Sequence, residues 1–204
     1  MPIKAILYDL DGVLIDTTDC HYVILNKALE QVAGTSIEKH ENDLYYDGLP
    51  TITKLDRLRK EGRVTLAQYD SIYQIKETHF MEYINQFTQR RPEKEMLHEW
   101  SKGKGLKLGC VTNCRTDVTK AMLQKSGQGQ YMDAVVHRDE VNNPKPHPEP
   151  YITCMVKLSV PPSECIILED SDAGMKSAYA KGSVVIKVNS VDEVNISLLE
   201  RYIR

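Results

Sequence analysis

Two aspartates, Asp9 and Asp11, directly follow a short apolar segment near the start of the chain. Side chains two residues apart on a strand point to the same side, so both carboxylates can converge at its carboxyl end. Open α/β sheets build their sites at that end. Carboxylates this close repel each other, and either a cation such as Mg²⁺ or a retained proton relieves the repulsion. The alternative is a solvated turn, because Asp and Gly12 are common turn residues.

Two further segments could bind a phosphate group. Thr112 and Asn113 end a second apolar segment, and a hydroxyl followed by backbone amides at a helix start suits a phosphate oxygen. The same pair is also an ordinary helix N-cap. Lys145 lies between Pro144 and Pro146. Because prolines restrict the backbone, this lysine would lose little freedom as a fixed countercharge, although an exposed loop lysine is the commoner case.

A fourth segment again places acids at the end of an apolar run. Glu169 and Asp170 follow residues 165–168 and precede a helical pattern. Both acids are candidate metal ligands, because Mg²⁺ prefers oxygen donors. Ser171 or Asp172 could at the same time cap the helix that follows.

The elements that must position these residues alternate along the chain. Short apolar segments bounded by turn residues predict strands over 3–8, 106–112, 133–137, 165–168 and 183–188. Apolar residues at helical spacing predict helices over 93–102, 117–125, 148–158 and 171–181. Strands that alternate with helices form parallel βαβ units, so we predict the α/β class with a Rossmann-like parallel sheet.

Residues 16–91 break this alternation. Apolar faces at helical spacing predict helices over 19–33, 51–61 and 65–87, with no strand between them. We therefore predict two domains. Residues 1–15 and 92–204 form the core, and residues 16–91 form an all-helical domain inserted after the first strand.

Composition argues against several classes of protein. The 204 residues carry 26 basic and 29 acidic side chains, whereas a nucleic-acid binder would normally be basic. No stretch approaches the roughly 20 apolar residues of a membrane span. Asp9 interrupts the first apolar run too early for a secretory signal. Five cysteines without such a signal favour free thiols over disulfides. We expect a cytoplasmic protein without nucleic-acid or membrane partners.

In chain order the four segments read DLDGVLIDT, VTN, KPHP and EDSDAG. This series resembles the motifs of the haloacid dehalogenase-like (HAD) superfamily, and the resemblance spans nearly the whole chain. The helical insertion resembles the cap domain of the subgroup that includes β-phosphoglucomutase and phosphoglycolate phosphatase. The resemblance implies a Mg²⁺-dependent, monomeric hydrolase that acts on small phosphorylated metabolites.

The resemblance also implies roles for the same residues. Asp9 matches the nucleophile that forms an aspartyl-phosphate. Asp11 matches the general acid that protonates the leaving alcohol and then acts as base toward water. The implied magnesium ligands are Asp9, the backbone carbonyl of Asp11, Asp170 and Glu169, the last directly or through water. The implied phosphate-binding residues are Thr112, Asn113 and Lys145.

The cap would select the substrate. His21 and Lys76 match cap positions that approach the active site in β-phosphoglucomutase. That mutase grips a second phosphate with an arginine after a glycine turn of its cap, and here Thr51 stands in that place. A hydroxyl supplies neither the charge nor the fork of an arginine. The sequence therefore predicts a phosphatase, with a phosphomutase of the β-phosphoglucomutase type as the alternative.

Overall fold

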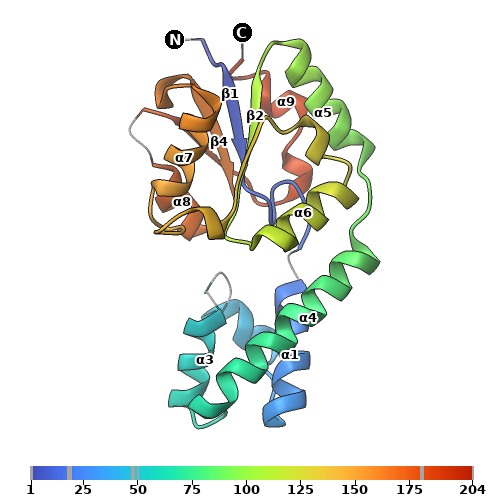
Figure 1. Ribbon diagram of the computed structural model, residues 1–204, viewed down its shortest axis with the longest axis vertical. Helices are drawn as coiled ribbons and strands as arrows, with labels where there is room; N and C mark the ends of the chain where they lie inside the picture. Colours follow the sequence, from blue (N-terminus) through green and yellow to red (C-terminus); the bar gives the residue numbers. More distant parts are fainter. Residues whose placement is uncertain (1, 18–19, 47–48, 50, 180–181, 204) are drawn as a thin grey trace. The chain divides into compact units, whose positions relative to one another are not determined.

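The computed structural model describes two compact units, each treated separately below (Figure 1). The core unit comprises residues 1–16 and 88–204, and the helical unit comprises residues 17–87. The structure describes residues 2–17, 20–46, 49, 51–179 and 182–203.

The core unit contains a five-stranded parallel sheet in the order β3-β2-β1-β4-β5. The strands are β1 (Ala5–Tyr8), β2 (Lys107–Val111), β3 (Ala134–Val136), β4 (Cys165–Glu169) and β5 (Val184–Lys187). All five predicted strands and the predicted α/β class are confirmed. Every residue of β1 is buried, as expected for a central parallel strand covered on both faces.

The register of the sheet aligns three strand ends. Tyr8 at the end of β1 pairs with Cys110 of β2 and with Leu168 of β4. The residues that follow each of these therefore emerge side by side at the carboxyl edge of the sheet. This edge carries the four segments that the sequence singles out.

Helices cover both faces of this sheet (Figure 1). In the view of Figure 1, α7 and α8 lie on one side of the strands, and α5 and α6 lie on the other. The helices are α5 (Pro92–Gly103), α6 (Thr116–Lys125), α7 (Glu149–Leu158), α8 (Asp172–Ala178) and α9 (Ile196–Leu199). Single 3₁₀ turns cover Gly129–Tyr131, Arg138–Glu140, Pro162–Glu164 and Val191–Glu193. The helix predicted over 171–181 ends at Ala178, and Lys181 lies outside the described residues.

The helical unit packs around its own apolar core. Its helices are α1 (Cys20–Ala33), α2 (Lys39–Glu41), α3 (Thr51–Lys60) and α4 (Tyr69–Phe87), with a π-helical turn over Asn42–Tyr46 and a 3₁₀ turn over Leu66–Gln68. Leu25, Leu29, Leu55, Leu58 and Ile72 are buried together there. Asp19, at the predicted start of the first of these helices, lies outside the described residues, as do Gly48 and Pro50.

Two elements of the helical unit are absent from the prediction, α2 and the π-helical turn that follows it. Their segment has few apolar residues at a regular spacing, and its local signal is a capping box between Glu38 and Glu41. Among the described helices, none combines the length and the apolar composition that crossing a bilayer requires.

Candidate active site

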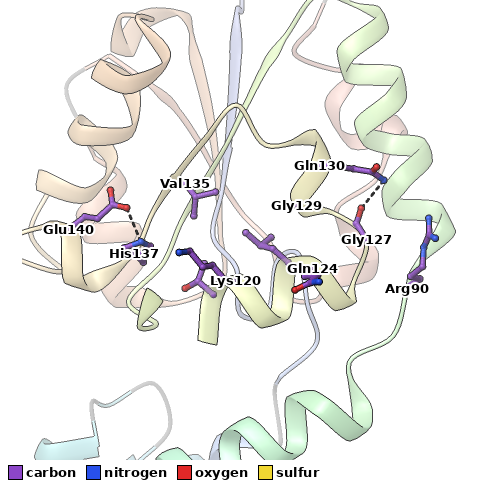
Figure 2. A pocket seen from close by; sticks show the side chains of 11 residues that line it. Arg90, Lys120, Gln124, Gly127, Gly129, Gln130, Val135, His137 and Glu140 are labelled. Carbon is purple, nitrogen blue, oxygen red and sulfur yellow. Dashed lines mark hydrogen bonds and ion pairs between the residues drawn. The ribbon is translucent and has the colours of Figure 1, made fainter. Parts of the chain in front are cut away.

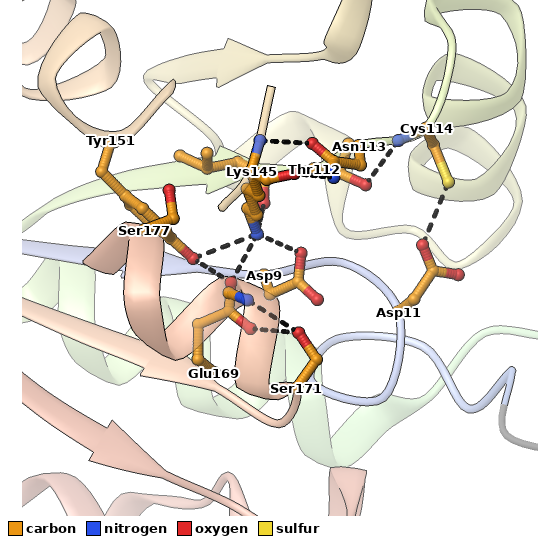
Figure 3. A network of polar contacts seen from close by, with 12 residues as sticks. Asp9, Asp11, Thr112, Asn113, Cys114, Lys145, Tyr151, Glu169, Ser171 and Ser177 are labelled. Carbon is orange, nitrogen blue, oxygen red and sulfur yellow. Dashed lines mark hydrogen bonds and ion pairs between the residues drawn. The ribbon is translucent and has the colours of Figure 1, made fainter. Parts of the chain in front are cut away.

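Four segments far apart in sequence meet at the carboxyl edge of the core sheet (Figure 3). Asp9 follows β1, Thr112 follows β2, and Glu169 ends β4. The backbone N–H of Asp9 donates to the carbonyl of Leu168, which fixes the chain next to β4. Lys145 comes from the loop before α7 and reaches the same point.

The side chain of Lys145 connects residues at the ends of three strands of the site. Its Nζ donates to Asp9 Oδ1 at 2.6 Å, to Glu169 Oε1 at 2.5 Å and to the carbonyl of Val111 at 2.8 Å. Its side chain is only 4% exposed, so it is not an ordinary loop lysine. Burial alone would lower the pKa of Lys145, but the charges of Asp9 and Glu169 outweigh it and raise the pKa above its ordinary value. The lysine therefore stays charged.

Asn113 holds the backbone of Lys145. Its Oδ1 accepts the N–H of Lys145 at 2.9 Å, and its Nδ2 donates to the carbonyl of Lys145 at 3.0 Å. The Asn113 side chain is therefore a positioning group for the lysine, a role that sequence reasoning missed. The phosphate contacts expected for Thr112 and for the Asn113 amide remain predictions.

Glu169 is a buried countercharge to Lys145. Its side chain is 0% exposed, and its Oε1 also accepts the hydroxyl of Tyr151 at 2.6 Å. Ser171 caps α8 by accepting the N–H of Gly174 at 3.0 Å, and its hydroxyl lies 3.4 Å from Glu169 Oε2. A Cβ at Gly174 would lie 1.9 Å from Glu169 Oε2, so this helix start has room for the carboxylate only because the residue is glycine.

Three carboxylates gather around this lysine. Ligand oxygens of Asp9, Glu169 and Asp170 all lie within 4.8 Å of one another. Burial raises the pKa of Asp9 well above its ordinary value, and Glu169 raises it further against the opposing effect of Lys145. Burial, then Glu169, raises the pKa of Asp170 to about 6. One lysine does not neutralise three acids, and the hard oxygen donors fit Mg²⁺ as the missing charge.

Gly12 brings the loop after β1 against Asp170. Its φ is +74°, a left-handed conformation that glycine adopts without strain, and a Cβ there would lie 2.0 Å from Asp170 Oδ2. The glycines of the first and fourth motifs therefore serve the same purpose, which is to make room for an acid of the cluster.

Asp11 has different surroundings from Asp9. Its Oδ2 accepts a hydrogen bond from the thiol of Cys114 at 3.0 Å, and Figure 3 shows it turned toward Cys114 while Asp9 faces Lys145. Burial and the charge of Asp11 raise the pKa of the Cys114 thiol well above its ordinary value, so the thiol stays protonated. Sequence reasoning treated the cysteines only as free thiols and missed this contact, although all five are indeed free.

The chain is similar to known proteins along most of its length. A family model described as haloacid dehalogenase-like hydrolase matches residues 6–188. The chain belongs to this family. It is 24% identical over 186 residues to fructose-1-phosphate phosphatase YqaB of Escherichia coli, covering 90% of this chain and 95% of that protein. It is 30% identical over 185 residues to pyrophosphatase PpaX of Bacillus velezensis, covering 86% and 82%.

The fold of this HAD-like hydrolase is also that of a solved structure. The structure of β-phosphoglucomutase from Clostridium difficile matches with a TM-score of 0.78 and 22% identity, covering 98% of this chain and 96% of that chain. This likeness confirms the predicted fold, and the family model confirms the membership suggested by the motifs. The chain is an enzyme that hydrolyses phosphate esters.

The helical unit of this hydrolase brings His21 and Lys76 together around one ring. His21 stacks on Phe80 with ring centroids 4.6 Å apart, and Lys76 Nζ lies 5.6 Å from the centroid of Phe80. Lys76 is buried, and its Nζ is 3.8 Å from Glu77 Oε1. Thr51 begins α3. The approach of His21 and Lys76 to a bound substrate remains a prediction.

A cavity of about 780 Å³ lies elsewhere in the core unit, beside α6 and β3 (Figure 2). Its lining includes Lys120, Gln124, Val135, His137 and Glu140. His137 Nε2 and Glu140 Oε1 are 2.8 Å apart, so these two side chains pair with each other. Neither Asp9 nor Asp170 lines this cavity, and we assign no chemistry to it.

Proposed function

We propose that the protein is a Mg²⁺-dependent phosphatase that hydrolyses a small phosphorylated metabolite through an aspartyl-phosphate. The bridge that Lys145 Nζ makes between Asp9 Oδ1 and Glu169 Oε1, beside Asp170, is the observation that carries this proposal. It combines a held carboxylate, a fixed positive charge and an acidic cluster, which phosphoryl transfer to a carboxylate requires. Relatives named as phosphatases of fructose 1-phosphate and of pyrophosphate support it.

The residues divide the chemistry between two steps. In the first, a carboxylate oxygen of Asp9 forms a bond to phosphorus, the bond from phosphorus to the leaving oxygen breaks, and Asp11 donates its proton to that oxygen. In the second, water attacks phosphorus, Asp11 takes the proton of this water, and the bond between Asp9 and phosphorus breaks. Lys145 orients Asp9 and offers its charge to the transferring group.

Asp9, the carbonyl of Asp11 and Asp170 would hold the metal. The oxygens of Glu169 already contact Lys145, Tyr151 and Ser171, so we assign it to support through water and through Lys145. Bound Mg²⁺ supplies positive charge against the nucleophile and the phosphoryl oxygens.

The same proposal assigns roles to the two domains and to their substrate-binding residues. Residues 1–15 and 92–204 form the catalytic domain, with Thr112 and Asn113 as the phosphate clamp. Residues 16–91 form the cap, whose His21 and Lys76 contact the polar tail of the substrate. The enzyme acts as a cytoplasmic monomer on a small phosphorylated compound, without nucleic-acid or membrane partners.

The test is phosphate release from sugar phosphates, phosphoglycolate, pyrophosphate and nucleotides, with Mg²⁺ or with EDTA. We expect turnover of at least one small ester that needs Mg²⁺ and is abolished by Asp9→Asn, because the near-isosteric amide is a poor nucleophile. Asp172→Asn is the matched control, since the Asp172 side chain is 86% exposed and pairs with Lys187 outside the acidic cluster. Full activity in EDTA, or in Asp9→Asn, contradicts the proposal.

The structural likeness to β-phosphoglucomutase favours a phosphomutase as the second candidate. A mutase must hold a second phosphate while the intermediate turns around, and Thr51 offers no charge for this. Incubation of β-glucose 1-phosphate with a trace of the 1,6-bisphosphate and Mg²⁺ separates the two functions. A phosphatase forms no glucose 6-phosphate, whereas rapid formation of it identifies a mutase.

A further inference from the structure

Cys114 joins two parts of the site that belong to different strands. Its backbone N–H donates to Thr112 Oγ1 at 3.0 Å, so its main chain is fixed to the end of β2. Its thiol donates to Asp11 Oδ2 at 3.0 Å, in the loop after β1 (Figure 3). One residue thus ties the expected phosphate clamp to the expected general acid.

A hydrogen-bond donor beside Asp11 matters because the proposed general acid must be oriented toward the leaving oxygen. An aspartate side chain can occupy several staggered rotamers, and a general acid acts only when its carboxyl group is within hydrogen-bond reach of the leaving oxygen. The main chain of Cys114 is held by its hydrogen bond to Thr112 Oγ1, so the thiol reaches the carboxylate from a fixed backbone position. The rotamer that satisfies this partner is thereby favoured over the others.

We propose that Cys114 is a positioning residue for leaving-group protonation, and that its thiol acts by fixing the orientation of the Asp11 carboxylate. This inference rests on the proposed phosphatase function and adds a residue to its machinery. It assigns no bond-making role to the sulfur, which neither gains nor loses a bond in the reaction.

Substrates with different leaving groups distinguish a loss of Asp11 positioning from a general loss of structure in the active site. An alkoxide leaving group needs a proton as the bond to phosphorus breaks, whereas a nitrophenolate leaves without one. The value of kcat/KM reports phosphoryl transfer to Asp9, including departure of the leaving group. We therefore compare kcat/KM for p-nitrophenyl phosphate with kcat/KM for the alkyl monoester that the wild type hydrolyses fastest.

In Cys114→Ala we expect kcat/KM for the alkyl ester to fall roughly 3- to 10-fold, the effect of losing one ordinary hydrogen bond. The aryl ester should change by less than about 2-fold. Cys114→Ser keeps a donor at the same place and should recover part of the loss. Cys165→Ala is the matched control, because that buried thiol donates to the carbonyl of Pro161 and not to an acid of the site. It should leave both substrates unchanged.

A double-mutant cycle tests whether Cys114 acts through Asp11. In an Asp11→Ala background there is no carboxylate to orient, so the further change Cys114→Ala should have no additional effect on the alkyl ester. Three outcomes would each overturn the inference. They are equal losses of kcat/KM on both esters, a Cys114→Ser variant no more active than Cys114→Ala, and a full additional loss of kcat/KM in the Asp11→Ala background. A wild type that hydrolyses neither ester refutes the proposed function instead, so the two failures are distinguishable.

Discussion

Removal of the Tyr151 hydroxyl tests how much the stability of the protein depends on the hydrogen bonds to the buried carboxylate of Glu169. It donates to Glu169 Oε1 at 2.6 Å, and both side chains are fully buried. Tyr151→Phe keeps the ring and its packing but removes a donor from the carboxylate. Hydrogen bonds to charged groups contribute about 1.5–3 kcal/mol, and Lys145 remains on the same oxygen. We therefore expect the free energy of unfolding to fall by about 2 kcal/mol.

Urea denaturation in EDTA measures this loss without a contribution from bound metal. The single tryptophan, Trp100, lies on α5 and reports unfolding of the core unit by its fluorescence. Tyr131→Phe is the matched control, because its hydroxyl donates to Glu99 Oε1 at 2.9 Å on the surface. We expect the control to cost less than about 1 kcal/mol. Equal costs in the two variants would refute the interpretation of Glu169 as a buried acceptor that depends on this hydrogen bond.

Three further predictions concern pH, backbone and metal. Burial lowers the pKa of His98 to about 4, below the ordinary value of 6.5, so its contribution to stability is complete above pH 6.5 and is lost as the pH falls toward 4. Between pH 7 and pH 5 the wild type should lose about 2 kcal/mol more than His98→Gln in urea denaturation. Gly12→Ala should raise the Mg²⁺ concentration for half-maximal activity at least about 10-fold by displacing Asp170, whereas Gly105→Ala, with a φ of +76° and open space around it, should not. Mg²⁺ at about 100 times its Kd should add roughly 2.7 kcal/mol to the free energy of unfolding of the wild type, and much less in Asp170→Asn, measured by thermal denaturation.

The sequence alone predicts the parts of this site that depend on local pattern. Asp9 and Asp170 follow apolar runs bounded by turn residues, and such runs become buried parallel strands whose carboxyl ends share an edge. Lys145 between two prolines could be singled out in the same way. Each of these signals lies within a few consecutive residues, so no tertiary contact is needed to see it.

The missed contacts depend on packing between distant segments. Cys114 reaches Asp11 across two strands, and Tyr151 reaches Glu169 from the first turn of α7. Neither pair shares a local pattern, because contact depends on sheet order and on the rotation of a helix about its axis. The order β3-β2-β1-β4-β5 itself is set by packing of the whole core. Only the apolar face of residues 148–158 indicated that a residue such as Tyr151 would be buried.

The central position of β1 in the sheet has a consequence for how the chain folds during its synthesis. Ala5 pairs with Lys107 and with Cys165, so its first partner emerges from the ribosome only after the whole helical unit has been synthesised. Residues 17–87 form a contiguous unit that is complete before either partner exists. During that interval the apolar strand is a nascent segment with two open edges, available to other chains. Asp9 is thus translated long before Asp170, and the candidate active site is assembled only when β4 arrives. Sheets of this topology are therefore expected to fold slowly.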